Sequence, residues 1–132
     1  ESYVLLSPNE MAVGFDKTIS WAEAASLPLS LLDAQMQNRR ILDRVFDDLG
    51  LKPKIVSESN GFMASMVMAR AGSVATILPL ALVDALGELG GTRVLKLVEP
   101  EQAWPICIAS LDRTPELTTV RALKQVVAGF LR

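Results

Sequence analysis

The sequence predicts an α/β fold, in which a mostly parallel sheet is flanked by helices. Half of its 132 residues are hydrophobic, which is enough for a buried core. Short apolar runs alternate with longer segments whose apolar residues recur at helical spacing. The stretch from Ile55 to Pro79 combines both patterns as a strand, a polar loop, an amphipathic helix, a glycine and a second strand. We interpret it as one β-α-β unit.

The first elements follow from local signals. Tyr3 to Ser7 is a compact apolar strand that ends at a proline. Ser20 and Glu23 form a capping box, because each side chain can satisfy a free amide at the start of a short helix. Pro28 to Leu32 is then a short buried strand.

A longer helix is predicted after the loop from Asp33 to Asn38, and Gly50 ends it. One side of this helix is apolar and faces the core: Ile41, Leu42, Val45, Phe46 and Leu49. The other side carries charges at spacings that allow ion pairs, and we expect it to be solvated: Arg39, Arg40, Asp43, Arg44, Asp47 and Asp48.

The β-α-β unit contains the polar loop of greatest interest. Ser59 or Asn60 is the expected N-cap of the helix, and Gly72 the expected C-cap. A helix N-terminus at the end of a strand offers free amides and a partial positive charge, so this loop is suited to a small anion. The alternative is that the loop residues only cap the helix.

The C-terminal third adds a helix from Leu80 to Leu86 and strands at Arg93 to Val98 and Ala103 to Ser110. Cys107 lies in the last of these strands, and we expect it to be buried as a small hydrophobic residue. Thr114-Pro115-Glu116 is a helix start with proline at the first helical position. The apolar face of that helix needs a covering surface: Leu117, Val120, Leu123, Val127, Phe130 and Leu131.

The composition narrows the chemistry. Histidine is absent, which excludes Ser-His-Asp and Cys-His catalysis and any zinc site that needs imidazole. The carboxylates are scattered over predicted polar faces, so we expect no enzyme activity, no metal and no cofactor. A formal charge of −2 and the lack of a basic run argue against direct DNA binding. No apolar run approaches the roughly 18 residues of a membrane span.

Several consecutive segments together resemble one known family: ESYVLLSP, KTISWAEAASLPLSLLD, NRRILDRVFDDLGLKPKIV, ARAGSVATILP and AWPICIAS. Their order looks like the second half of the effector-sensing domain of LysR-type transcriptional regulators. The resemblance spans nearly the whole chain, and AG-x-x-x-x-x-LP is its sharpest motif. The chain has Val74 where the family usually has a second glycine, which predicts a less tight turn.

The resemblance implies a lobe of a periplasmic-binding-protein-like (type II) domain. Residues 1–8 would be a crossover strand from lobe one, and residues 9–102 the effector-binding second lobe. Residues 103–132 would be the crossover strand and C-terminal helix that return to lobe one. The first part of lobe one would lie outside this sequence, so we expect apolar surface to remain exposed or to pair with another copy in a homo-oligomer.

The resemblance also implies a function, which is the binding of a small effector, an anion or a carboxylate, between two lobes. Most of the expected effector-binding residues fall at the carboxyl ends of strands: Ser59, Asn60, Gly61, Phe62, Ile77, Leu78 and Pro79. Trp104, near the second crossover, is either a hinge-side effector-binding residue or packing. Glu58 would either repel a carboxylate, orient a donor or lie on the surface, and Met63 is either a cleft residue or packing.

In this hypothesis the protein is cytoplasmic, and DNA is bound only by a winged helix that precedes Glu1. Three alternatives stay open from the sequence. The chain could belong to an exported solute-binding protein of the same fold, to an oligomerisation module or to a small enzyme. An upstream helix-turn-helix would support the regulator, whereas an upstream signal peptide would support the exported solute-binding protein.

Overall fold

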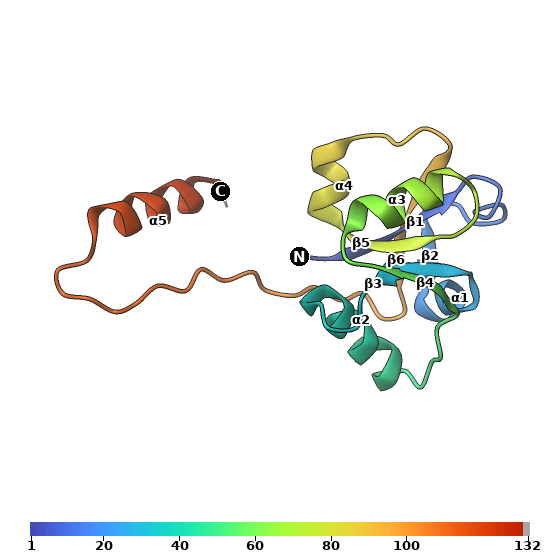
Figure 1. Cartoon of the computed structure of the whole chain (residues 1–132), viewed down its shortest axis with the longest axis horizontal. Coiled ribbons are helices and arrows are strands. Elements are labelled where there is room, and N and C mark those ends of the chain that lie inside the picture. Colours follow the sequence, from blue (N-terminus) through green and yellow to red (C-terminus); the bar gives the residue numbers. More distant parts are fainter. Residues whose placement is uncertain (131–132) are drawn as a thin grey trace.

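The computed structural model describes residues 1–130 and contains a three-layer lobe followed by an extended segment and a last helix (Figure 1). The strands are β1 (Tyr3–Pro8), β2 (Thr18–Ser20), β3 (Leu29–Leu32), β4 (Ile55–Ser59), β5 (Thr76–Pro79) and β6 (Thr92–Val98). The helices are α1 (Trp21–Ser26), α2 (Gln37–Asp48), α3 (Phe62–Arg70), α4 (Leu80–Leu86) and α5 (Thr118–Phe130).

The strands of the lobe share one direction, except for β1. The four-stranded sheet has the order β2-β6-β1-β5, and β3 pairs with β4 in a second, two-stranded sheet. A parallel bridge between Leu29 and Ala75 joins β3 to the start of β5. β1 runs antiparallel to both β5 and β6, whereas β2 with β6 and β3 with β4 are parallel. The predicted α/β fold is therefore confirmed, and its four-stranded sheet is mixed because β1 is antiparallel to both of its neighbours.

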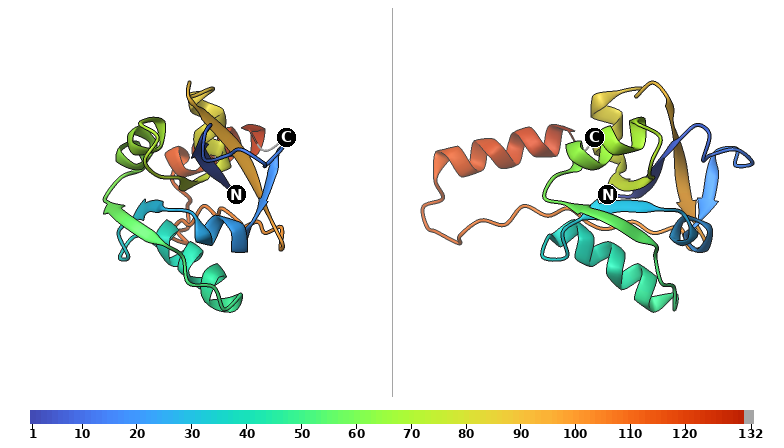
Figure 2. Two further views of the ribbon diagram at one scale, coloured as in Figure 1. Left: turned by 90° about the vertical axis from the view of Figure 1, so that its right-hand side faces the viewer. Right: turned by 45° about the vertical axis from the view of Figure 1, so that its right-hand side comes forward.

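Helices cover both faces of the sheets (Figures 1 and 2). The cluster beneath α1 and α2 contains Trp21 and Phe46, whose rings meet edge to face with centroids 5.6 Å apart. The cluster beneath α3 and α4 contains Met66, Leu78 and Val83. Alternate residues of a strand point to opposite faces, so neighbouring β5 residues enter different clusters.

The predicted capping box is confirmed, and the glycine predicted as the C-cap of α3 lies one residue after the actual C-cap, Ala71. The hydroxyl of Ser20 accepts a hydrogen bond from the Glu23 amide at 3.2 Å, while the Glu23 carboxylate accepts one from the Ser20 amide at 2.9 Å. Gly72 follows the end of α3 with φ +90°, a left-handed conformation that glycine adopts without the steric cost a Cβ would add. Both helix boundaries are thus encoded locally.

The C-terminal predictions are only partly correct. The strand expected at Ala103 to Ser110 is absent, because within residues 1–130 no strand pairs with this segment. Cys107 is exposed rather than buried. The last helix begins at Thr118 instead of at Pro115. Leu131, expected on its apolar face, lies outside the described residues.

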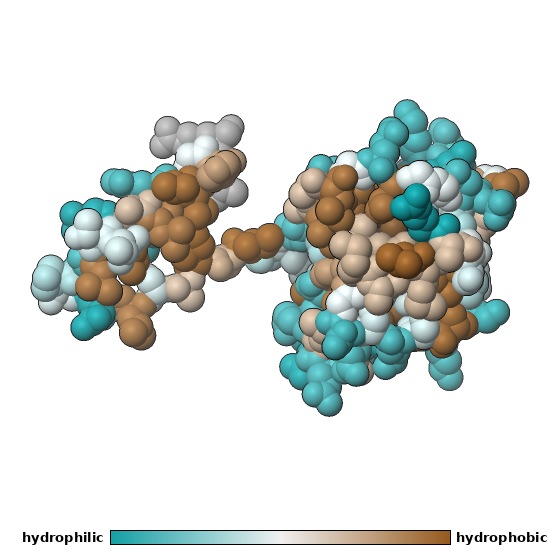
Figure 3. Space-filling view, turned by 45° about the horizontal axis from the view of Figure 1, so that its top comes forward, coloured by the Kyte–Doolittle hydropathy of each residue, from teal (hydrophilic) through white to brown (hydrophobic). Residues whose placement is uncertain are grey.

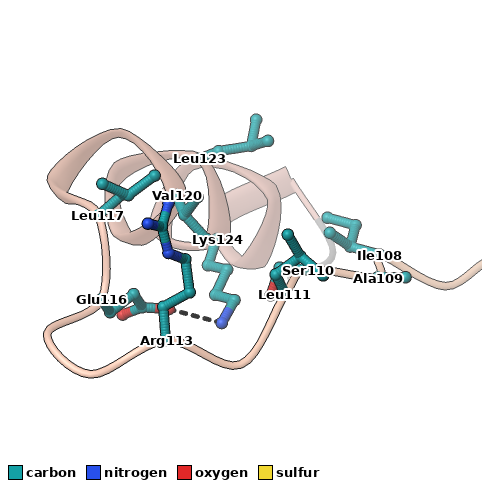
Figure 4. A pocket seen from close by; sticks show the side chains of 10 residues that line it. All are labelled: Ile108, Ala109, Ser110, Leu111, Arg113, Glu116, Leu117, Val120, Leu123 and Lys124. Carbon is teal, nitrogen blue, oxygen red and sulfur yellow. Dashed lines mark hydrogen bonds and ion pairs between the residues drawn. The ribbon is translucent and has the colours of Figure 1, made fainter.

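The extended segment carries α5 away from the lobe, and α5 has no buried residue (Figures 1 and 3). Figure 3 shows hydrophobic side chains on the surface of this C-terminal part. Leu123 and Phe130 of α5 are 55% and 86% exposed. A hollow of about 250 Å³ separates residues 108–113 from α5 (Figure 4). Its walls come from the C-terminal segment alone, away from the strand ends described next.

Candidate functional site

The candidate site is the edge of the lobe at which the parallel strands end. β3 ends at Leu32, β4 at Ser59 and β5 at Pro79. Because β1 is antiparallel to β5, its first residue, Tyr3, pairs with Pro79 at the same edge. This edge of an α/β sheet is where loops and helix N-termini converge on ligands.

Four of the sequence-predicted residues lie at the junction of β4 and α3: Ser59 ends β4, Asn60 and Gly61 form the loop, and Phe62 begins α3. Neither Ser59 nor Asn60, the two predicted N-caps, caps the helix. The N-cap is Gly61, and no side chain bonds to the helix amides there. Ser59 is still part of β4, since its carbonyl oxygen accepts a hydrogen bond from the Asp33 amide at 2.8 Å. Its hydroxyl donates to the Gly61 carbonyl oxygen at 2.9 Å. The amides of the first turn of α3 therefore carry no side-chain acceptor.

The side chains of this loop differ in burial. Asn60 is exposed, and Phe62 is half-buried against the cluster beneath α3 and α4. Met63 has 63% of its surface exposed. The loop thus combines an exposed amide side chain with an aromatic ring that is anchored at its base.

The β5 residues are not equivalent. Ile77 and Leu78 are 2% and 0% exposed and belong to the two opposite core clusters. Pro79 is half-buried and lines a cavity of about 240 Å³. In this structure Pro79 reaches the edge itself, while Ile77 and Leu78 form the packed floor behind it.

The cavity brings Pro79 and Trp104 together with residues that sequence reasoning missed. It is lined by Glu1, Tyr3, Asn38, Ile41, Pro79, Trp104, Pro105 and Ile106. The rings of Tyr3 and Trp104 meet edge to face, with centroids 5.2 Å apart and an interplanar angle of 81°. The Trp104 amide donates to the Glu1 carbonyl oxygen at 2.7 Å, which holds the two chain segments side by side.

Tyr3 and Asn38 supply two uncharged polar side chains to this cavity, which Glu1 also lines. The Tyr3 hydroxyl donates to Asn38 Oδ1 at 2.8 Å. Burial, and then the charge of Glu1, raise the pKa of Tyr3, so its phenol stays protonated and remains a donor at neutral pH. The antiparallel direction of β1 places Tyr3 here, and no local pattern in the sequence encodes that direction.

The prediction that the charged face of α2 is solvated is wrong at Arg39. The residue is 7% exposed, and one of its guanidinium nitrogens donates to the Leu32 carbonyl oxygen at 2.7 Å and to Glu58 at 3.1 Å. Its Nε donates to Asp43 at 2.7 Å. Burial lowers the pKa of Arg39, but the two carboxylates outweigh it and the net shift is upward. Arg39 therefore links α2 to the ends of β3 and β4. Its positive charge compensates the negative charge of Glu58.

The site offers hydrogen bonding and apolar contact. Among residues 1–130, no group of three acidic, histidine or cysteine side chains is arranged to hold a metal ion. In the same part of the chain, no helix has the length and apolar character to cross a membrane. The arrangement is suited to binding a small molecule of mixed polarity.

Comparison with known proteins places this fold. The family model described as the LysR substrate binding domain matches residues 1–132. A comparison with curated proteins found no match.

Solved structures with similar folds include one regulator and two effector-binding domains, each with its ligand. CbnR, a LysR family transcriptional regulator, has a TM-score of 0.67 at 19% identity, over 76% of this chain and 35% of CbnR. The effector binding domain of QuiR in complex with shikimate has a TM-score of 0.67 at 17% identity, over 77% and 47%. The effector binding domain of BenM with benzoate has a TM-score of 0.64 at 15% identity, over 76% and 46%. The chain spans about a third to a half of these proteins.

Proposed function

Because the chain belongs to the LysR substrate-binding domain family, we propose that it is the second lobe of an effector-sensing domain in a LysR-type transcriptional regulator. The observation that carries this proposal is the match of the family model over residues 1–132. The similar folds of CbnR, QuiR and BenM support it.

The effector would bind at the strand-end edge, between this lobe and a first lobe supplied by the rest of the protein. The residues proposed to contact it, or to support the contact surface, are Ser59, Asn60, Gly61, Phe62, Ile77, Leu78, Pro79 and Trp104. Tyr3 and Asn38 join them, since they share the cavity with Pro79 and Trp104. The uncapped amides at the start of α3 favour an anionic group, because they carry partial positive charge.

We propose a small carboxylate as the effector. Shikimate and benzoate, the ligands in the QuiR and BenM structures, are both carboxylates with a ring. In this chain the α3 amides would receive the carboxylate, and the aromatic rings of Phe62 and Trp104 would contact the ligand body.

The proposed domain organisation explains the exposed C-terminal segment. Glu1 and Trp104 are joined by two hydrogen bonds at this edge, and residues 1–8 and the segment that begins at residue 103 would be the two crossings between lobes. Residues 103–132 would return to lobe one, where the surface of that lobe would cover the apolar side chains of α5.

Regulation would follow from a difference in affinity. An effector that binds one lobe arrangement more tightly shifts the population toward it, by an amount set by that difference. The proposed parent protein is a cytoplasmic homo-oligomer without enzyme activity, and its contact with DNA is made by a winged helix in another part of the chain.

A thermal-shift screen of the complete two-lobe domain tests this function. The ligands are ring carboxylates, aliphatic carboxylates, amino acids and inorganic anions, each tested on wild type, Asn60→Ala and Phe62→Ala. A ligand at 100 times its Kd stabilises the folded state by about 2.7 kcal/mol, because it binds only that state. We expect one class to stabilise wild type and to lose most of this effect in both variants.

The matched control is Asn9→Ala, an exposed asparagine after the opposite end of β1. This variant should respond to the ligand as wild type does. Stabilisation that survives in Asn60→Ala and Phe62→Ala would place the ligand elsewhere. Silence of the folded wild-type domain toward all classes would remove support for effector sensing.

A further inference from the structure

Three serine hydroxyls form a connected cluster beneath the loop between β4 and α3. Ser30 of β3 and Ser65 of α3 are 0% and 1% exposed, and their hydroxyl oxygens are 2.9 Å apart. Ser65 is also 3.1 Å from the hydroxyl of half-buried Ser59. Ser59 in turn donates to the Gly61 carbonyl oxygen at 2.9 Å. The cluster therefore links the buried interior to the loop.

The direction of these hydrogen bonds follows from counting protons. Each hydroxyl has one proton, and a carbonyl oxygen can only accept. Since Ser59 gives its proton to the Gly61 carbonyl, Ser65 must donate to Ser59. Ser65 has then used its own proton, so Ser30 must donate to Ser65. The chain of donors runs from Ser30 through Ser65 and Ser59 to Gly61.

The Met68 sulfur does not reverse this order. It lies 3.9 Å from the Ser30 hydroxyl and 3.7 Å from that of Ser57. If Ser30 donated to the sulfur, one of the two contacts made by Ser65 would have no proton between its oxygens. A thioether is a weak acceptor, so the arrangement that fills both oxygen contacts is favoured.

We propose that Ser65 is a positioning residue, which fixes the β4–α3 loop through Ser59 before any ligand binds. The inference rests on the proposed function only in that this loop is the effector site. Ser65 anchors the loop to α3, and Ser59 orients the Gly61 carbonyl. The Ser59 hydroxyl already donates its proton to the Gly61 carbonyl oxygen. An anionic group would therefore accept hydrogen bonds from the α3 amides and not from this hydroxyl.

The test compares Ser65→Ala with Ser30→Ala in the full chain, without effector. Each substitution removes one fully buried hydroxyl, so a purely structural role predicts similar consequences. The directed chain predicts a difference, because Ser30→Ala leaves the bonds from Ser65 to Ser59 and from Ser59 to Gly61 intact. NMR order parameters of the Asn60 and Gly61 amides, and hydrogen exchange of the Asp33 amide, report on the loop.

In Ser65→Ala we expect lower order parameters at Asn60 and Gly61 and about fivefold faster exchange at Asp33, the factor that one neutral hydrogen bond of ordinary net strength supplies. Ser30→Ala should resemble wild type at these amides. Ser59→Ala should loosen the loop at least as much as Ser65→Ala, and it alters a half-buried position that folding tolerates more easily. Exchange of the Leu29 amide, at the other end of β3, is the internal reference.

Equal loosening in Ser65→Ala and Ser30→Ala, or no loosening in Ser59→Ala, would overturn the proposal. Because no effector is used, the result is independent of the ligand screen. If the loop loosens in Ser65→Ala as expected but the domain binds no ligand, only the proposed function is contradicted. If a ligand binds at the loop but Ser65→Ala leaves the loop unchanged, only the positioning role is contradicted.

Discussion

The lobe and the C-terminal segment use similar apolar patterns with opposite outcomes. α2 places Leu42, Val45 and Phe46 in the core, where each is at most 3% exposed. α5 is also amphipathic, yet it has no buried residue. α2 lies on a sheet face, whereas α5, in the described part of the chain, stands away from the lobe and beside its own connecting segment. An amphipathic pattern predicts which side of a helix requires cover, but the covering surface must come from elsewhere.

The largest expected contrast is between two phenylalanines. Phe46→Ala leaves a cavity against Trp21, so we expect a loss of about 3–5 kcal/mol in the free energy of unfolding. Phe130→Ala, at 86% exposure, should change it by no more than about 0.5 kcal/mol. Chemical denaturation of both variants measures the difference. Comparable losses would show that α5 is packed.

The next contrast lies within α2, between adjacent arginines. Arg39→Met leaves the Leu32 carbonyl and two carboxylates without their partner, which should cost about 2–3 kcal/mol. The value is below that of a fully buried pair, because the side chains of Asp43 and Glu58 are 37% and 46% exposed. Arg40→Met, its exposed neighbour, should stay within about 0.5 kcal/mol by denaturation. Equal losses of stability in the two variants would show that Arg39 lies on a solvated face, as the sequence predicted.

A smaller effect is expected at the start of α1. Ser20→Ala removes the cap and should cost about 1 kcal/mol at neutral pH. Hydrogen bonds from the side chain and then the backbone of Ser20 lower the pKa of Glu23 below 4.5. A lowered carboxylate pKa adds stability that is present above pH 4.5 and is lost as the pH falls through the folded value.

Stability measured from pH 6 to pH 3 should therefore decline less steeply in Ser20→Ala than in wild type. The control is Ser26→Ala, which removes an exposed hydroxyl near the end of the same helix. An unchanged acid slope in Ser20→Ala would show that the capping box does not hold the Glu23 charge.

The smallest effect on stability is expected at Cys107. The exposed thiol of the 132-residue chain should react with a thiol reagent at the rate of an unfolded peptide, without a change in the unfolding midpoint. The same thiol should be protected in the complete two-lobe protein, where we propose that this segment crosses into lobe one. Mass spectrometry of timed reactions measures both rates. Protection in the short chain would mean that the segment packs on the lobe.

Local signals were sufficient for much of the fold. The capping box at Ser20, the glycine after α3 and the apolar face of α2 were predicted because each depends on residues within one or two helical turns. The Ser59 to Phe62 loop was located for the same reason, although its N-cap was displaced to Gly61.

Features that depend on contacts between distant segments could not be predicted from the sequence. Arg39 turns inward because the ends of β3 and β4 present a carbonyl oxygen and Glu58 to it, and neither partner is apparent from helical spacing. Tyr3 reaches the site through the antiparallel pairing of β1 with β5. The prediction of a buried Cys107 in a strand was wrong for the same reason, because an apolar run forms a strand only beside a partner strand.

The most direct test of the central claim is an NMR titration of the two-lobe domain with the ligand class found in the thermal-shift screen. We predict shifts of amide resonances at Asp33 to Asn38, Asn60 to Met63 and Trp104, which share the strand-end edge. The opposite edge, at Asn9 to Phe15 and Gly87 to Gly91, should stay unchanged. Shifts confined to that opposite edge, or to the hollow between residues 108–113 and α5, would contradict the account.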